Sequence, residues 1–144
     1  MKWILISMLG IVVLAACEGN VYSLKVGDCY NGVTTDKYSG ETMEVTDVEL
    51  ISCDEPHESE VYAIFDLPDS DWKGSDYVYE QAGIFCLDSF EAFVGVEYAL
   101  STLGADFIYP TEDSWKDMGD RLVQCSIYQE SYVKVSGSLR GSRR

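Results

Sequence analysis

Histidine is almost absent from this chain of 144 residues, since His57 is the only one. Zinc sites usually combine several histidine or cysteine ligands, so a multi-histidine zinc centre is excluded. A glycine-rich phosphate loop after a strand and the Gly-x-Ser-x-Gly motif of serine hydrolases are also missing. Because the easily recognised catalytic motifs are lacking, we expect a protein that is not an enzyme and that carries no cofactor and no bound metal.

Positive charge is the second scarce property. Ten lysines and arginines stand against 25 aspartates and glutamates, which gives a formal net charge of −15. Four of the bases lie in the last eleven residues, namely Lys134, Arg140, Arg143 and Arg144. Such an acidic surface repels nucleic acid, which is therefore not expected as a partner. The surface would attract cations or basic partner segments, unless it serves only to keep the domain soluble.

The N-terminal residues are typical of a targeting segment. Lys2 is a short positive region, and Trp3 to Leu14 is an apolar run too short to span a bilayer comfortably. Leu14-Ala15-Ala16-Cys17 resembles the lipobox of bacterial lipoproteins, in which the cysteine thiol is acylated. We therefore predict a lipoprotein signal peptide over residues 1–16, a lipidated polar tether over 17–24 and one domain over 25–144, anchored by lipid on the outer face of the cell membrane. An ordinary secretory signal, with Cys17 incidental, is the alternative.

The remaining cysteines predict two disulfides. Once Cys17 is set aside, an even number is left in an exported domain: Cys29, Cys53, Cys86 and Cys125. Three pairings are possible. We favour Cys29–Cys53 with Cys86–Cys125, because the first pair would lie on neighbouring strands. No Cys-x-x-Cys pair is present, so a reactive thiol is not expected.

One long helix is predicted over Ser75–Gly95. Ser75 is expected as its N-cap and Gly95 as its stop. Its apolar residues recur at the spacing of an amphipathic helix that packs on a core: Val78, Ala82, Phe85, Cys86, Phe90 and Phe93.

The strongest strand signal is Val61 to Phe65, which is β-branched and aromatic. Strict alternation would place Val61, Ala63 and Phe65 on one face and Tyr62 and Ile64 on the other. Both faces are apolar, which indicates a central strand covered on both sides.

The other predicted elements complete an α+β fold. Further strands are expected from Cys29, over Glu44–Cys53, over Arg121–Tyr128 and over Tyr132–Val135, with a hairpin loop over Thr34–Thr42 and a helical turn over Thr111–Gly119. The predicted architecture is an antiparallel sheet of four to six strands with the long helix packed on one face.

Two places could bind a ligand. His57 with Asp54, Glu55, Glu58 or Glu60 could hold a metal weakly, although such a histidine is more often hydrogen-bonded within a turn. Asp120 and Arg121 could tie down a loop by charge-assisted hydrogen bonds, or Arg121 could project and bind an anion.

A calcium loop is the third candidate, and it is a poor one. Asp69, Asp71, Gly74 and Glu80 occupy positions 1, 3, 6 and 12 of an EF-hand-like loop. Lys73 stands where an acidic or amide ligand is required. A solvated acidic turn is therefore the favoured interpretation.

Several groups of residues, spread over about residues 25–143, form a pattern that is specific as an ensemble. They are Gly27-Asp28-Cys29; Cys53 to Ala63; Cys86, Tyr98, Ser101 and Pro110; Trp115, Gly119, Asp120, Arg121 and Cys125; and Gly137-Ser138-Leu139-Arg140-Gly141. This ensemble resembles the bacterial septum-formation domain, a family found on exported and membrane-tethered proteins. The resemblance implies a link to cell division, and no activity or catalytic residue comes with it.

Three functional hypotheses follow. The first is a non-enzymatic binding or scaffold module, anchored at Cys17, with a protein partner in the cell envelope. The second is a lipoprotein that binds a ligand or a cation. The third is an envelope hydrolase with a pair of carboxylates, which 25 acidic residues make possible.

Overall fold

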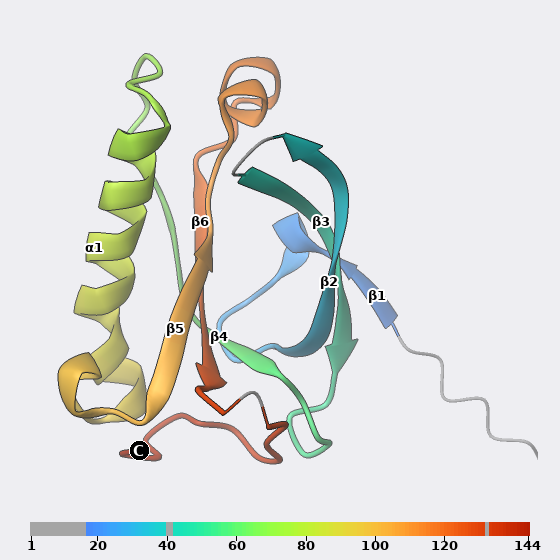
Figure 1. Ribbon diagram of the computed structural model, residues 1–144, viewed down its shortest axis with the longest axis vertical. Helices are drawn as coiled ribbons and strands as arrows, with labels where there is room; N and C mark the ends of the chain where they lie inside the picture. Colours follow the sequence, from blue (N-terminus) through green and yellow to red (C-terminus); the bar gives the residue numbers. More distant parts are fainter. Residues whose placement is uncertain (1–16, 40–41, 132) are drawn as a thin grey trace, which may run out of the picture.

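The computed structural model describes residues 17–39, 42–131 and 133–144. An antiparallel sheet in the order β1-β3-β2-β4-β6-β5 carries one long helix on one face (Figure 1). The strands are β1 (Cys17–Asn20), β2 (Cys29–Ser39), β3 (Thr42–Ile51), β4 (Ser59–Asp66), β5 (Leu103–Ile108) and β6 (Leu122–Gln129), and the helix is α1 (Ser75–Val94). Three single helical turns, η1 (Val21–Ser23), η2 (Tyr98–Leu100) and η3 (Ser114–Met118), lie between them. The predicted α+β class is confirmed.

Helix α1 packs on the sheet through the predicted apolar stripe. Phe90 is fully buried, and Phe85 stacks on Phe65 of β4 with ring centroids 3.6 Å apart. Gly95 ends the helix in the left-handed region, at a φ of 87°, as predicted. The expected N-cap is wrong, because Ser75 is already the first helical residue and Gly74, at a φ of 99°, stands before it.

Strand β4 is buried on both faces, as predicted. Val61, Tyr62 and Ala63 are all buried. The predicted alternation is wrong, however, because the register against β6 shifts between Val61 and Ala63. This irregularity lets Tyr62 and Ala63 both join the main core beneath α1, whereas Val61 and Ile64 join a second core.

Both predicted disulfides are present. Cys29–Cys53 connects the start of β2 to the turn after β3, and Cys86–Cys125 connects α1 to β6. The Tyr62 hydroxyl donates a hydrogen bond of 2.8 Å to the Cys86 carbonyl, so the helix is held to the sheet by a covalent and a polar contact at the same place.

The sheet divides into two parts between β2 and β4. Only Cys29 and Tyr30 of β2 pair with β4, at Glu60 and Ser59. Beyond that point β2 and β3 curl away from the side that carries α1 (Figure 1). The second core fills part of this curl with Leu24, Tyr30, Val48 and Val61.

Residues 17–24 pack on the domain, which corrects the predicted tether. Strand β1 pairs with β3, from Cys17 opposite Leu50 to Asn20 opposite Asp47. Val21 and Leu24 are 3% and 6% exposed. Leu24 of this segment therefore supplies part of the second core. The predicted signal peptide, residues 1–16, lies outside the described residues.

Two further strand predictions need correction. The hairpin loop expected over Thr34–Thr42 is mostly strand, since β2 runs to Ser39 and β3 starts at Thr42. No strand is found at 133–135 in the described part of the C-terminal segment. Val135 makes only an isolated bridge to His57 there, and Tyr132 lies outside the described residues. No helix in the described ranges combines the length and hydrophobicity that a membrane crossing requires.

The Cys86–Cys125 disulfide should contribute strongly to stability, because its cysteines lie 39 residues apart and the link constrains a long loop of the unfolded chain. A Cys86→Ala/Cys125→Ala variant should lose about 4 kcal/mol of unfolding free energy in urea denaturation. The shorter Cys29–Cys53 loop, tested by the matching double alanine variant, should lose about 3 kcal/mol. A loss below about 1 kcal/mol for Cys86–Cys125 would contradict this account.

Candidate functional site

His57 is fully buried, and its backbone ties the C-terminal segment to the turn before β4. Its N–H donates to the Val135 carbonyl at 2.9 Å, and its own carbonyl accepts from the Val135 N–H at 3.0 Å. Its Nδ1 lies 3.0 Å from the Glu55 carbonyl, which can only accept, so Nδ1 carries the proton. Nε2 has no hydrogen-bond partner among the described residues.

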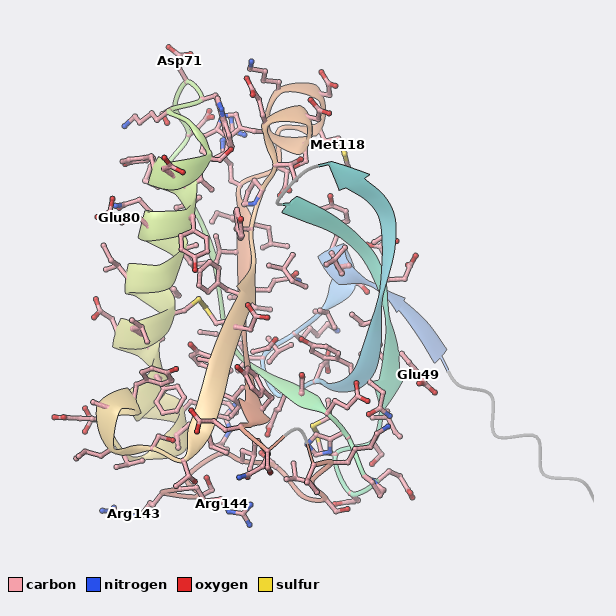
Figure 2. The ribbon with its side chains drawn as sticks, viewed as in Figure 1. Glu49, Asp71, Glu80, Met118, Arg143 and Arg144 are labelled. Carbon is pink, nitrogen blue, oxygen red and sulfur yellow. A yellow bond between two sulfur atoms is a disulfide. The ribbon has the colours of Figure 1, made fainter. Side chains whose placement is uncertain are left out.

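Glu60 is also fully buried and holds the same segment with its side chain. One carboxylate oxygen accepts from the Ser138 hydroxyl and the other from the Leu139 N–H, each at 2.6 Å. Leu139 is buried in the main core, and Arg140 lies over the Phe93 ring at 4.2 Å. The basic C-terminal segment is thus a strap across one end of the sheet. Arg143 and Arg144 lie at this end, opposite Asp71 and Met118 (Figure 2).

The potential metal ligands at this place already make bonds that hold the fold together. The Cys29 sulfur, His57 and Glu60 lie within 4.8 Å of one another. The Cys29 sulfur is bonded to Cys53, so it offers no thiolate, and Glu60 already accepts two hydrogen bonds. The structure brings Glu60, rather than Glu58, to His57. This arrangement favours a structural role for the histidine turn.

Asp120 and Arg121 tie down the η3 turn. The Asp120 carboxylate accepts from the Ser114 hydroxyl at 2.9 Å and from the Leu122 N–H at 3.0 Å. Arg121 lies over the Trp115 ring at 3.7 Å and pairs with Asp69 at 2.9 Å. Both side chains therefore serve the loop, which is the structural alternative predicted from the sequence.

The calcium-loop residues do not converge. Asp69 turns to Arg121, Asp71 lies at the tip of the loop (Figure 2), and Glu80 is exposed on α1. Among the described residues, the only group of three or more acidic, histidine or cysteine side chains close enough to share an ion is the one at Cys29. The solvated acidic turn is the interpretation that fits this geometry.

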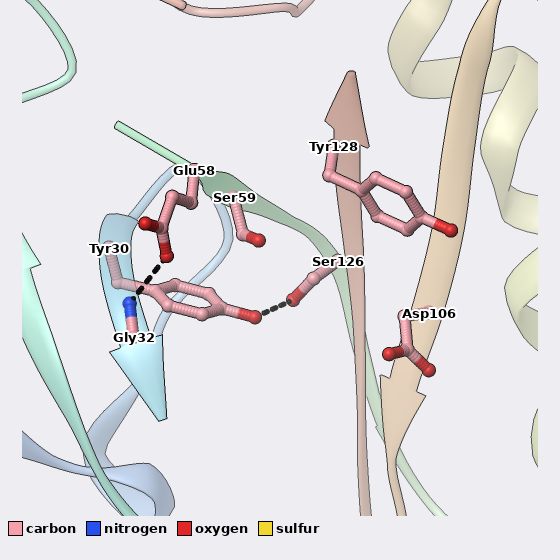
Figure 3. Close-up of a pocket in the computed structure, with 7 residues that line it drawn as sticks. All are labelled: Tyr30, Gly32, Glu58, Ser59, Asp106, Ser126 and Tyr128. Carbon is pink, nitrogen blue, oxygen red and sulfur yellow. Dashed lines mark hydrogen bonds between the residues drawn. The ribbon is translucent and has the colours of Figure 1, made fainter. Parts of the chain in front are cut away.

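A polar groove of about 460 Å³ opens where β2 leaves β4. Its floor is the face of β5 and β6 that is turned away from α1, with Asp106, Ser126 and Tyr128. Its other wall consists of Tyr30 and Gly32 of β2 with Glu58 and Ser59. Figure 3 shows Tyr30 reaching across the groove to Ser126, with Glu58 and Asp106 on opposite sides. The volume lies within the range of about 300–1,000 Å³ that small-molecule sites occupy.

The Tyr30 hydroxyl is a neutral group at the bottom of this groove. It donates a hydrogen bond of 2.9 Å to the Ser126 hydroxyl, and both side chains are buried. Burial raises the pKa of Tyr30, and the negative charge of Asp106 raises it further. The groove therefore offers neutral hydroxyls between two exposed carboxylates, Glu58 and Asp106.

Gly104 is required beside this groove by a close approach. It lies opposite Tyr128 in the β5–β6 pair, and the Tyr128 ring lies across its Cα. A Cβ atom at Gly104 would overlap that ring. A side chain at this position would therefore displace Tyr128 from the floor of the groove.

A second, apolar groove of about 340 Å³ runs between α1 and β5. Three large side chains of α1 at its rim are about half exposed: Tyr79 at 56%, Ile84 at 50% and Leu87 at 48%. A Cβ at Gly83 would stand 3.6 Å from the Phe107 ring, which is an ordinary van der Waals contact. The groove thus lies along the side of α1 that is next to β5.

Sequence reasoning found Glu58 but missed the rest of the polar groove. One signal was available in β6, where Gln124, Ser126 and Tyr128 alternate with apolar residues and so mark a polar face. The contribution of Tyr30 and Asp106 carried no local signal, because both belong to other strands.

The buried Glu60 carboxylate should be essential for the strap. A Glu60→Ala variant leaves the Leu139 N–H unpaired, so we expect a loss of about 3 kcal/mol of unfolding free energy. Hydrogen exchange at Leu139 and Gly141 should accelerate at the same time. The exposed Glu49→Ala variant is the control and should change neither measurement. Unchanged exchange at Leu139 in Glu60→Ala would refute the role assigned to Glu60.

Alkaline pH should destabilise the domain. Burial raises the pKa of Tyr62, as it does that of Tyr30, above the usual value of about 10. The folded state then holds both protons more tightly than the unfolded state, so stability is complete below about pH 10 and falls as the pH rises further. Urea denaturation at increasing pH measures this fall. A Tyr30→Phe/Tyr62→Phe variant should show a shallower decline, and an unchanged slope would contradict the assignment.

Comparison with known proteins places the chain in a family. A family model described as septum formation matches residues 16–140, which is most of the chain. Comparison with curated proteins finds no match. Comparison with solved structures finds none either. The match includes the cross-linked sheet, the strap down to Arg140 and both grooves, so the chain belongs to the septum-formation family, which indicates a role related to cell division.

Proposed function

We propose that this protein is a membrane-anchored, extracytoplasmic and non-enzymatic binding module that captures a protein partner in the cell envelope during septum formation. The observation that carries the proposal is the apolar groove on α1. Tyr79, Ile84 and Leu87 are about half exposed along one groove. Contiguous apolar surface of this kind is characteristic of interaction sites in proteins that are otherwise well solvated.

The surroundings of the apolar groove suggest the character of the partner. Glu80, Asp88 and Glu91 are exposed on the same helix, and no lysine or arginine occurs between Ser75 and Val94. An interface with an apolar centre and an acidic rim would suit a partner whose own rim is basic. The many acids elsewhere on the domain would favour the same kind of partner.

The lipobox-like sequence from Leu14 to Cys17 supports the proposed anchor. In this proposal acyl chains on Cys17 hold the protein in the membrane. Because β1 begins at Cys17 and pairs with β3, no free tether would separate the lipid from the sheet. Figure 1 shows β1 and α1 on opposite sides of the molecule. The apolar groove would therefore face away from the bilayer, toward the envelope.

A carboxylate hydrolase is the second candidate, because Glu58 and Asp106 line one groove from opposite sides (Figure 3). A glycosidase needs one carboxylic acid that stays protonated, usually in an apolar setting. Both carboxylates here are exposed, and Glu58 accepts from the Gly32 N–H at 2.7 Å. Neither carboxylate therefore lies in such an apolar setting, which supports binding over hydrolysis.

The partner can be tested by crosslinking in the cell, followed by affinity capture of the tagged protein and mass spectrometry. We expect the wild-type protein to enrich cell-division or wall-synthesis proteins. An Ile84→Glu/Leu87→Glu variant should lose most of this enrichment, since both side chains are exposed and their substitution leaves the core intact. Met118→Glu, at another exposed apolar residue, is the matched control and should behave as wild type.

Three other results would overturn parts of the proposal. Equal enrichment by wild type and by the Ile84→Glu/Leu87→Glu variant would remove the α1 groove as the docking site. A Cys17→Ala variant that is still recovered with membranes would contradict the lipid anchor. Turnover of an envelope glycan by the purified domain, lost in Glu58→Gln, would establish the hydrolase instead.

A further inference from the structure

The polar groove has an unbalanced charge. Among the lining residues that the structure describes, Glu58 and Asp106 are charged and none is basic. The remaining polar groups are hydroxyls, those of Tyr30, Ser59 and Ser126 among them. Among the ion pairs of the described residues, none involves Asp106, whose carboxylate accepts from the N–H of the adjacent Phe107 at 2.8 Å. The groove therefore presents acceptors for a positively charged group.

The chain itself places a cation at one end of this groove. The Lys134 ammonium lies 3.5 Å from a Glu58 oxygen, and the two side chains are 45% and 46% exposed. The other Glu58 oxygen is held by the Gly32 N–H, so the carboxylate is fixed in orientation. An ion pair at this distance and exposure is weak and exchanges readily with solvent. Lys134 thus shows that Glu58 pairs with an ammonium group, and another ammonium could replace Lys134 at this contact.

We propose that the polar groove binds a ligand that carries a primary ammonium group, and that this group replaces Lys134 at Glu58. The remainder of the ligand lies over Tyr30 and Ser126 and presents a second amine or hydroxyl donor to Asp106. Amino sugars, and peptides that contain a diamino-acid residue such as lysine, both carry a primary ammonium group. The tyrosine rings of the lining add cation–π attraction for the ammonium.

The groove is preformed, which favours binding of a small ligand. Tyr30 and Ser126 are locked to each other by their hydrogen bond, and both are more than nine-tenths buried. The Cys29–Cys53 disulfide lies directly beside Tyr30 in β2, and Asn31 accepts from the Glu58 N–H at 3.0 Å. Little conformational freedom would be lost when a ligand enters such a site.

This inference is independent of the apolar groove on α1, because no residue of the described part of the chain lines both grooves. Loss of partner capture in the Ile84→Glu/Leu87→Glu variant would leave ligand binding intact. Failure of ligand binding would likewise leave the partner proposal standing.

The test is calorimetric and NMR titration of the full domain with three probes. A disaccharide of two glucosamine units and a lysyl-lysine amide both carry free ammonium groups, and their comparison distinguishes an amino sugar from a peptide as the source. The di-N-acetylated disaccharide has the same shape without the charge. We expect at least one of the charged probes to bind, with amide shifts at Gly32 and Ser126, and to bind about tenfold more tightly than the acetylated form. Added salt should weaken that binding.

Variants give the sharper readout. Glu58→Gln and Asp106→Asn keep the hydrogen-bond acceptors for Gly32 and Phe107, so both should fold and should bind the charged probe about tenfold more weakly. Asp88→Asn makes the same charge change on α1, outside the groove, and should have no such effect. Lys134→Met should bind more tightly than wild type, because the competing ammonium is gone. A merely structural role for Glu58 and Lys134 would not produce that gain.

Three results would overturn the proposal. Equal binding of the charged and acetylated disaccharides would show that the ammonium group does not contribute to binding. Equal weakening by Asp88→Asn and Glu58→Gln would show only a general effect of net charge. If neither charged probe shifts the amides of Gly32 and Ser126 at concentrations up to about 10 mM, the groove does not bind this class of ligand.

Discussion

Strand β4 has to bury both of its faces, and the rest of the structure depends on this constraint. One face belongs to the core beneath α1, and the other to the second core, which Leu24 and residues of β2 and β3 complete. A strand whose apolar side chains are buried on both faces is stabilised more than a strand with one exposed face, because each Å² of buried apolar surface contributes roughly 25 cal/mol. The irregularity after Val61 is what allows Tyr62 and Ala63 to serve the same core.

The start of the same strand organises the C-terminal segment. Glu60 is fully buried, so its carboxyl group requires hydrogen-bond partners there. Those partners are the Ser138 hydroxyl and the Leu139 N–H, and the second of these bonds brings Leu139 into the main core. The basic C-terminal segment is thus fixed to the core, although its charges would be costly to bury there. Arg140 remains over the Phe93 ring.

The two grooves are consequences of the way in which the sheet is divided. Because β2 shares only two residue pairs with β4, β2 and β3 can curl away and leave room above Ser126. On the other side of the sheet, α1 is anchored by Cys86 to β6, so its outer residues stand next to β5 and form the apolar groove. A polar and an apolar site thus lie on opposite faces of one rigid sheet, which would let the protein bind a small ligand and a partner together.

Sequence by itself determined the elements whose signals are local. The 3.6-residue stripe from Val78 to Phe93 specified α1, Gly95 specified its end, and the apolar run from Val61 specified a central strand. The even count of cysteines predicted two disulfides, and the expected neighbouring strands favoured, among three possible pairings, the one that the structure has. The pattern of residues around Asp120 also indicated the tied loop, because adjacent residues made the contact.

Only the tertiary structure decided the sites. Tyr30, Glu58, Asp106 and Ser126 come from separate segments, and no local pattern states that the sheet curls to bring them to one groove. The irregularity in β4 and the packing of residues 17–24 on β3 likewise depend on which side chains must share a core. Helices and strands follow from periodicity along the chain, whereas a site is set by contacts between distant segments, and those contacts exist only once the sheet has closed around its two cores.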